Sequence, residues 1–179
     1  HDPDNVKAVA ELAIEYKELI IGFDIAGPEL NYLPSMYKDS FLKLKNEGIN
    51  VTIHAGEGDG VHSIQEALDN GAKRIGHGVR IIEDISDNND LGPTADYILQ
   101  NNIPLEVCIT SNLHTNMYKS PQDHPISRLH KLGFNISLNT DNRLMSNTSI
   151  NNELKIAEVA GVENPTSLLK YSAGDSFFN

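Results

Sequence analysis

Residues 51–60 read VTIHAGEGDG, and the two halves of this stretch differ in character. Val51 to Ile53 are mostly β-branched, as expected of a buried strand, because branched side chains pack well on a pleated surface. His54 stands where that strand ends, and Glu57 follows among glycines that allow a sharp turn. The stretch therefore predicts a buried strand that carries two ionisable groups at its carboxyl end.

Four other stretches have the same strand-like character. Each is short, nearly continuously apolar or β-branched and bounded by Gly, Asn or Pro, which is typical of strands buried on both faces of a parallel sheet. Helical patterns lie between them, so the chain predicts an α/β fold, either an open doubly wound sheet or part of a closed (β/α)₈ barrel. No GxGxxG motif follows a strand, which weakens the dinucleotide-binding interpretation. The five strand-like runs are 19–27, 49–56, 72–78, 103–110 and 134–140.

Three helices have recognisable sequence signals. The first has its apolar residues on one face. Ser63-x-x-Glu66 predicts a capping box at the start of a second, and Pro125 suits the first turn of a third. The apolar residues of the first helix are Val6, Val9, Leu12, Ala13 and Tyr16.

Polar side chains stand at or near the carboxyl ends of all five predicted strands. In a (β/α)₈ barrel the parallel strands point their carboxyl ends at one face, so these groups would converge on a single mouth. This placement favours the barrel over the doubly wound sheet. The groups are Asp24, His54 with Glu57, His77, Thr110-Ser111-Asn112, and Asp141 with Asn142.

The residue types in this set suit metal-assisted hydrolysis. Imidazole and carboxylate are ligands for Zn²⁺, which lowers the pKa of a bound water to about 7, and His54 and Asp141 are the candidate ligands. Glu57 could carry a proton to a heteroaromatic nitrogen, and His77 could orient or deprotonate the attacking water. The structural alternatives are a hydrogen-bonded histidine at a strand end and an aspartate that caps a turn.

The composition excludes several classes of protein. The chain has 25 acidic and 14 basic residues, a formal charge of −11 and no cluster of Lys or Arg, so a nucleic-acid partner is not expected. No apolar run could cross a membrane, and the single Cys108 excludes an internal disulfide. We expect a soluble, cytoplasmic protein. Histidines outside the strand ends are interpreted as surface or packing residues; they are His62, His114, His124 and His130.

Four ordered segments, within about residues 22–156, resemble the signature segments of the adenosine deaminase family of zinc amidohydrolases. The resemblance implies a (β/α)₈ barrel that hydrolyses adenosine and deoxyadenosine to inosine and deoxyinosine plus ammonia, through attack of a zinc-activated water on purine C6. A purine nucleoside would then be the partner. The segments are His54-Ala-Gly-Glu57, Arg74-Ile-Gly-His77-Gly78, Thr110-Ser-Asn112 with Thr115, and Ser137-Leu-Asn-Thr-Asp141.

The resemblance also implies a role for each matching residue. His54 corresponds to a zinc-binding histidine, and Asp141 to the carboxylate that binds zinc and holds the water. Glu57 corresponds to the acid that protonates purine N1. His77 corresponds to the histidine that positions the attacking oxygen.

Four further residues have implied roles around these. Gly27 resembles the glycine whose backbone N–H meets purine N3, and Asp24 and Ser111 would support the metal site. Many members of the family have a second aspartate, which contacts N7, where this chain has Asn142. An amide can donate through its NH₂, so that contact could survive.

The family's His-x-His pair, which supplies two more zinc ligands, does not occur in residues 1–179. The chain begins at His1 without a methionine and ends at Phe177-Phe178-Asn179. We therefore expect the C-terminal portion of a single barrel domain, from about strand four to strand eight, with its N-terminal portion missing. One Zn²⁺ per full-length chain is expected. The fragment alone should bind zinc weakly and be inactive, with its open edges covered by the missing half or by a second copy.

Two alternative functions remain. One is a deaminase for adenine or for another purine, such as a modified nucleotide; the adenine-specific relatives tend to have Asp where this chain has Gly76. The other is a non-catalytic paralogue that binds nucleosides. Cytidine-type zinc deaminases need a Pro-Cys-x-x-Cys motif, which a chain with one cysteine cannot supply.

Overall fold

A computed structural model describes residues 2–169 and contains a five-stranded parallel sheet with the order β1-β2-β3-β4-β5. Each strand pairs with the next along the chain, as in the register of Phe23 with Val51 and Leu105 with Ile136. The expectation for Phe177 and Phe178 falls outside the described residues. The strands are β1 (Phe23–Ile25), β2 (Val51–Ala55), β3 (Arg74–His77), β4 (Leu105–Val107) and β5 (Ile136–Leu138).

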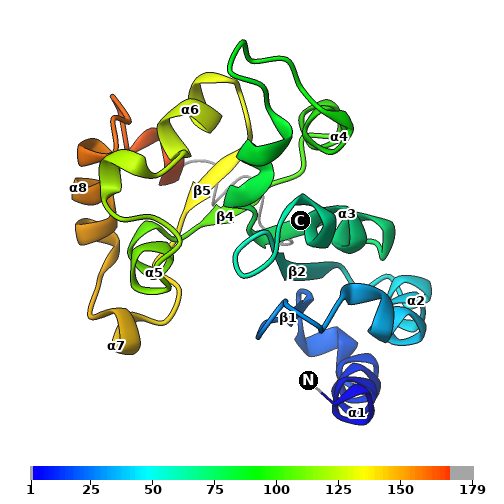
Figure 1. The fold of residues 1–179 in the computed structure, drawn as a ribbon. Helices are drawn as coiled ribbons and strands as arrows, with labels where there is room; N and C mark the ends of the chain where they lie inside the picture. The colour runs from blue at the N-terminus through cyan, green and yellow to red at the C-terminus, as the bar shows by residue number, and fades with distance from the viewer. Residues whose placement is uncertain (1, 170–179) are drawn as a thin grey trace.

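The strand order decides between the two predicted architectures. A doubly wound sheet reverses its strand order at a switch point, whereas a (β/α)₈ barrel adds each strand on the same side of the last. The sequential order of these strands is that of the barrel. Helices α2, α3, α4 and α6 follow one another around the sheet in chain order, and α5 and α7 lie on its other side (Figure 1).

The α-helices connect the strands and cover the sheet. They are α1 (Pro3–Glu15), α2 (Lys38–Asn46), α3 (Val61–Asp69), α4 (Pro93–Gln100), α5 (Ile109–His114), α6 (Ile126–Lys131), α7 (Arg143–Ser146) and α8 (Ile150–Val159). Short 3₁₀ segments are η1 (Lys17–Leu19), η2 (Pro34–Tyr37), η3 (Val79–Asp84) and η4 (Pro121–Asp123). Within residues 2–169 no helix combines the length and apolarity needed to span a bilayer.

Each observed strand lies inside one of the predicted runs. The centres of the strands form the core, where Ile53, Ile75 and Leu105 are at most 2% exposed. The strands are shorter than the runs because the chain turns early. The run 103–110, for example, stops being strand at Val107, and α5 begins two residues later.

The predicted capping box is wrong. Helix α3 begins at Val61 with Gly60 as its N-cap, so Ser63 lies inside its first turn. The Ser63 hydroxyl instead accepts from Gly56 N and donates to Glu29, and the Glu66 carboxylate accepts from Ser35 N. Both side chains therefore bind neighbouring segments rather than capping their own helix.

The apolar face of α1 is only half buried. Ala10 lies in the core, with Val6 and Ala13 packed against it. Val9 and Leu12 are each 53% exposed. The spacing correctly predicts a helix, but the apolar stripe is wider than the surface it packs on.

Candidate active site

The side chains of His54 and His77 meet at the carboxyl ends of neighbouring strands. Their ring centroids are 5.1 Å apart in an edge-to-face arrangement. In the register of β2 and β3, His54 lies opposite Gly76. A Cβ at Gly76 would lie 2.4 Å from Cδ2 of His54, so only glycine leaves room for this imidazole. The absence of a side chain at Gly76 therefore leaves the space that the His54 ring occupies.

Glu57 reaches this pair from the loop after β2. Its Oε2 lies 3.5 Å from Nε2 of His77, and its Oε1 accepts a hydrogen bond from Asn112 at 3.3 Å. Burial raises the pKa of Glu57, and the negative charges of Glu29 and Asp141 raise it further, against the smaller opposing effects of His54 and Asn112. A carboxyl group in this setting retains its proton to a higher pH than usual and suits a proton donor.

Asp141 joins the site from the loop after β5. Its Oδ2 accepts a 2.7 Å hydrogen bond from the Ser111 hydroxyl. The Asp141 charge raises the pKa of His54, Glu57 and His77, although burial has the larger effect on each of them. The four central residues of the predicted site therefore lie at the same end of the sheet.

Two of these residues have a strained backbone. His77 and Asp141 have φ values of 60° and 53°, in the left-handed region. The other non-glycine residues with positive φ within the described ranges are asparagines, and Asn, Asp and His are the side chains found most often in this conformation. Residues held in such conformations cost about 1–3 kcal/mol each and occur preferentially at functional sites.

The pKa values of the two histidines are shifted in opposite directions, although burial lowers both. Burial lowers the pKa of His77 to about 4, assisted by the charge of His54. Burial also opposes protonation of His54, but Asp24, with Glu106 and Asp141, raises its pKa overall. Oδ2 of Asp24 lies 3.6 Å from Nε2 of His54, a charge contact rather than a hydrogen bond.

A small cavity lies beside His54, and Gly27, the predicted purine-binding glycine, is one of its lining residues. Gly27 has a φ of 144°, open to glycine, and lines this cavity with Glu29 and His54. The predicted residue Asn142 is exposed and caps α7, since its Oδ1 accepts from Met145 N at 3.1 Å. That bond occupies its oxygen and leaves the NH₂ group as the one that could face a ligand.

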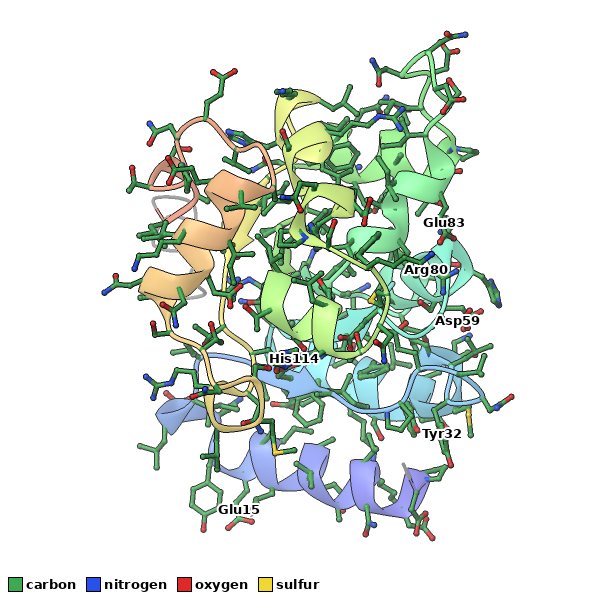
Figure 2. The ribbon with its side chains drawn as sticks, turned by 60° about the vertical axis from the view of Figure 1, so that its left-hand side comes forward. Glu15, Tyr32, Asp59, Arg80, Glu83 and His114 are labelled. Atoms are coloured by element: carbon green, nitrogen blue, oxygen red, sulfur yellow. The ribbon has the colours of Figure 1, made fainter. Side chains whose placement is uncertain are left out.

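Glu57 lines a second cavity. Arg80 and Glu83, two of its lining residues, pair through hydrogen bonds of 2.7 and 3.3 Å and lie side by side in Figure 2. Exposed His114 on α5 is labelled in the same view and takes no part in the site. The remaining lining residues are Gly58, Thr115, Met117 and Tyr118.

The sequence-based interpretation missed Glu29. This carboxylate is 7% exposed and accepts four hydrogen bonds, three from the turn that carries Glu57 and one from helix α3. The donors are the backbone N–H groups of Gly56, Glu57 and Asp59 and the hydroxyl of Ser63, at 2.8–3.0 Å. Glu29 follows β1 as the other site residues follow their strands, so the same strand-end signal could have identified it.

The sequence does not reveal the contacts of Asn112 and His124. Asn112 belongs to the polar group at the end of a predicted strand, and in the structure it is completely buried and contacts both Glu57 and His77. His124 is a buried packing residue, as predicted, and also bonds Asn112 at 3.2 Å. Neither contact leaves a signal in the sequence, since the partners come from different strands and helices.

Among the described residues, the side chains at this end of the sheet include donors for a metal ion, but not a complete set. Across residues 2–169 there is no group of three or more His, Cys, Asp or Glu side chains arranged to hold a metal ion. The imidazole of His54 and the carboxylate of Asp141 nevertheless lie at the same end of the sheet, and both are donor types that Zn²⁺ accepts. These two residues fit part of a zinc site.

Comparisons with known proteins agree with this arrangement. The family model described as Adenosine deaminase matches residues 1–165. "Adenosine deaminase 1" of Streptomyces coelicolor is 49% identical over 153 residues, 82% of this chain and 39% of that protein. The chain spans less than half the length of the curated relatives it matches.

Solved structures share the fold. An adenine deaminase from Arthrobacter aurescens matches 99% of this chain and 54% of its own with a TM-score of 0.86 and 23% identity. An amidohydrolase from Burkholderia ambifaria with bound Zn matches 100% of this chain and 50% of its own, with a TM-score of 0.85 and 17% identity. The five parallel strands are thus part of a (β/α)₈ barrel, and the predicted fold class is confirmed.

Proposed function

We propose, on the premise that this chain belongs to the adenosine deaminase family, that the complete protein hydrolyses adenosine and deoxyadenosine to inosine and deoxyinosine plus ammonia. The observation that carries the proposal is the convergence of four side chains on one end of the sheet, from strands and loops far apart in sequence. These are His54, Glu57, His77 and Asp141.

In this proposal Glu57 is the proton donor. Deamination at C6 requires a proton on purine N1 as the amino-bearing carbon is attacked, and a carboxyl whose pKa is raised by burial is suited to supply it. The bond from Asn112 and the loop contacts of Glu29 hold this carboxyl in place. His77, with Nε2 turned toward Glu57, contacts the attacking water.

His54 and Asp141 are the zinc ligands in this proposal. A bound Zn²⁺ lowers the pKa of a coordinated water toward 7. One ion per complete protein is proposed, with two more histidine ligands outside this chain, because catalytic zinc sites use three or more protein ligands. Ser111 holds the Asp141 carboxylate, and the Asp24 carboxylate lies beside His54.

The purine would lie between the two cavities and contact two further residues. Gly27 lines the cavity beside His54, where its backbone N–H could meet N3. The Asn142 amide donates through its NH₂ to N7, in keeping with the use of its oxygen to cap α7. A cytoplasmic location is proposed as well, in accord with the single Cys108.

We propose that residues 1–179 form the C-terminal portion of one barrel domain, from about strand four to strand eight. Within residues 2–169 the edge strands β1 and β5 each pair with a single neighbour, and such edges associate readily. The N-terminal portion of the domain, or a second copy, would cover them. Two ligands hold Zn²⁺ weakly, so this portion alone is proposed to be inactive.

Adenine is the rival substrate within the superfamily. The position that tends to be Asp in adenine-specific relatives is Gly76, and here any side chain at that position would displace His54. This packing supports the nucleoside over the free base.

The test is a comparison of kcat/KM for adenosine, adenine and a purine nucleotide with the complete, zinc-loaded protein. Adenosine should be the best substrate by at least about tenfold, and metal analysis should give about one zinc per chain. Faster turnover of adenine would replace the proposed substrate. Absence of both metal and turnover would favour the non-catalytic nucleoside-binding alternative.

A further inference from the structure

We propose that His124 and Asn112 are positioning residues that hold neutral His77 in the tautomer protonated at Nε2. His77 then presents an N–H donor, and not a lone pair, to the reacting oxygen. The tautomer follows from the hydrogen bonds alone. The catalytic consequence rests on the proposed function.

A relay of hydrogen bonds runs from Ile126 through His124 and Asn112 to His77. It begins at a backbone N–H group, which can only donate. The backbone N–H of Ile126 points at Nδ1 of His124 over 3.2 Å, so Nδ1 must accept and carries no proton. A neutral imidazole with a bare Nδ1 is protonated at Nε2. That Nε2 lies 3.2 Å from Oδ1 of Asn112 and donates to it.

Asn112 donates the next hydrogen bond, to the His77 ring. With its oxygen facing His124, the Asn112 NH₂ points at Nδ1 of His77 over 3.1 Å and at Oε1 of Glu57 over 3.3 Å. Nδ1 of His77 therefore accepts, and the ring proton of neutral His77 must be on Nε2.

The His124 end of the relay fixes the orientation of the Asn112 amide. If the amide were flipped, its NH₂ would face the N–H of His124, and the two donors would repel each other. This orientation does not depend on the protonation state of Glu57.

Because the relay is buried, its hydrogen bonds determine the tautomer of His77. Asn112 is 0% exposed, His77 2% and His124 3%, so water has little access to replace the missing partners. Burial also lowers the pKa of His124 to about 3, which keeps its ring neutral near pH 7. A cationic His77 would place a second N–H against the Asn112 NH₂, which the relay disfavours.

The fixed tautomer restricts what His77 can do. Its Nε2 faces the site, 3.5 Å from Oε2 of Glu57. With the proton there, His77 orients the attacking oxygen by donating a hydrogen bond. A neutral ring of this tautomer has no lone pair in that direction with which to take a proton from water.

Nitrogen-15 NMR of the complete protein, labelled at histidine, tests the tautomer directly. The His77 signals are assigned by their loss in His77→Gln. We expect, at pH 7, an unprotonated Nδ1 and a protonated Nε2. A protonated Nδ1, or a cationic ring, would overturn the proposal. This readout needs no turnover, so its failure is distinct from failure of the proposed function.

Variants test the two positioning residues. Asn112→Asp replaces the donor by an acceptor of the same shape, and should move the His77 proton to Nδ1 and lower kcat roughly 10- to 100-fold, with a smaller change in KM. Asn152→Asp, at an exposed position on α8, is its control and should change neither quantity. An unchanged tautomer in folded Asn112→Asp would contradict the proposal.

A second pair of variants covers the case in which Asn112→Asp does not fold. His124→Phe keeps the bulk of the ring but donates no hydrogen bond, and should weaken the preference for Nε2 and lower kcat. His124→Gln restores a donor toward Asn112 and should recover most of both. Equal losses in Phe and Gln would show that His124 acts only by packing. His114→Phe, exposed on α5, is the control.

Discussion

The carboxylate of Glu29 accepts a 2.8 Å hydrogen bond from the backbone N–H of Glu57, which makes one acidic residue the support of another. The same carboxylate accepts from Gly56 and Asp59, so the whole turn after β2 wraps around it. Its charge also contributes to the raised pKa of Glu57, second only to burial. Glu29 therefore both holds the turn that carries Glu57 and helps to raise the pKa of Glu57.

Glu29→Gln should destabilise the turn after β2 and lower the pKa of Glu57. An amide NH₂ would face backbone N–H groups that now donate, which should destabilise the protein by about 1–3 kcal/mol. Loss of the negative charge should lower the pKa of Glu57, so activity that needs its proton should be lost at a lower pH. Chemical denaturation and a pH profile of kcat/KM check the two effects.

Glu11→Gln is the matched control, because Glu11 forms an exposed ion pair with Lys43 on the outer helices. It should alter neither stability nor the pH profile measurably. An unchanged alkaline limb in Glu29→Gln would show that Glu29 does not act on Glu57.

Gly76→Ala should disturb the proposed metal site without disturbing the fold. The new Cβ would lie 2.4 Å from the His54 ring, which must move. We expect zinc affinity to fall roughly 10- to 100-fold, measured by competition with a chelator. Gly71→Ala, where φ is 91° but the surroundings are open, should cost about 1 kcal/mol of stability and leave zinc affinity unchanged. Equal zinc affinities of Gly76→Ala and the wild type would contradict the placement of His54.

Buried His124 should make the protein less stable in mild acid. Its pKa is lowered to about 3 when folded, from 6.5 in the unfolded chain. Above pH 6.5 the ring is neutral in both states. As the pH falls below 6.5 the unfolded state takes up a proton that the folded state refuses, so stability is lost down to about pH 3.

His124 should therefore cost about 2 kcal/mol of stability between pH 6.5 and pH 5. Denaturation midpoints at the two pH values measure this loss. His124→Gln should show a smaller decrease than the wild type, whereas the exposed-site control His62→Gln should show the same decrease. If the His124→Gln and wild-type curves fall in parallel, another group is responsible.

Much of the fold could be predicted from local patterns. The five β-branched runs contain the five strands, and residues placed at their carboxyl ends, such as His54 and Asp141, do converge. This works because parallel strands bring their carboxyl ends to one edge whatever the loops do. The capping prediction at Ser63 failed because a tertiary partner, Glu29, competes for the same hydroxyl.

Contacts between distant segments could not be predicted from the sequence. Glu153 of α8 is fully buried and accepts from Thr110 of α5 and from Thr148, an anchor that no spacing rule indicates. The bond between Asn112 and His124 is of the same kind. Each depends on how helices pack over the strands, which becomes visible only in three dimensions.

The central claim is that His54, Glu57, His77 and Asp141 form one deaminating site, and Glu57→Gln tests it most directly. The measurement is ammonia release from adenosine by the complete, zinc-loaded protein. We predict that the wild type turns over adenosine and that the variant retains its zinc but loses roughly 10²- to 10⁴-fold in kcat. Equal rates for the two proteins, or no turnover by the wild type at full zinc occupancy, would contradict the account.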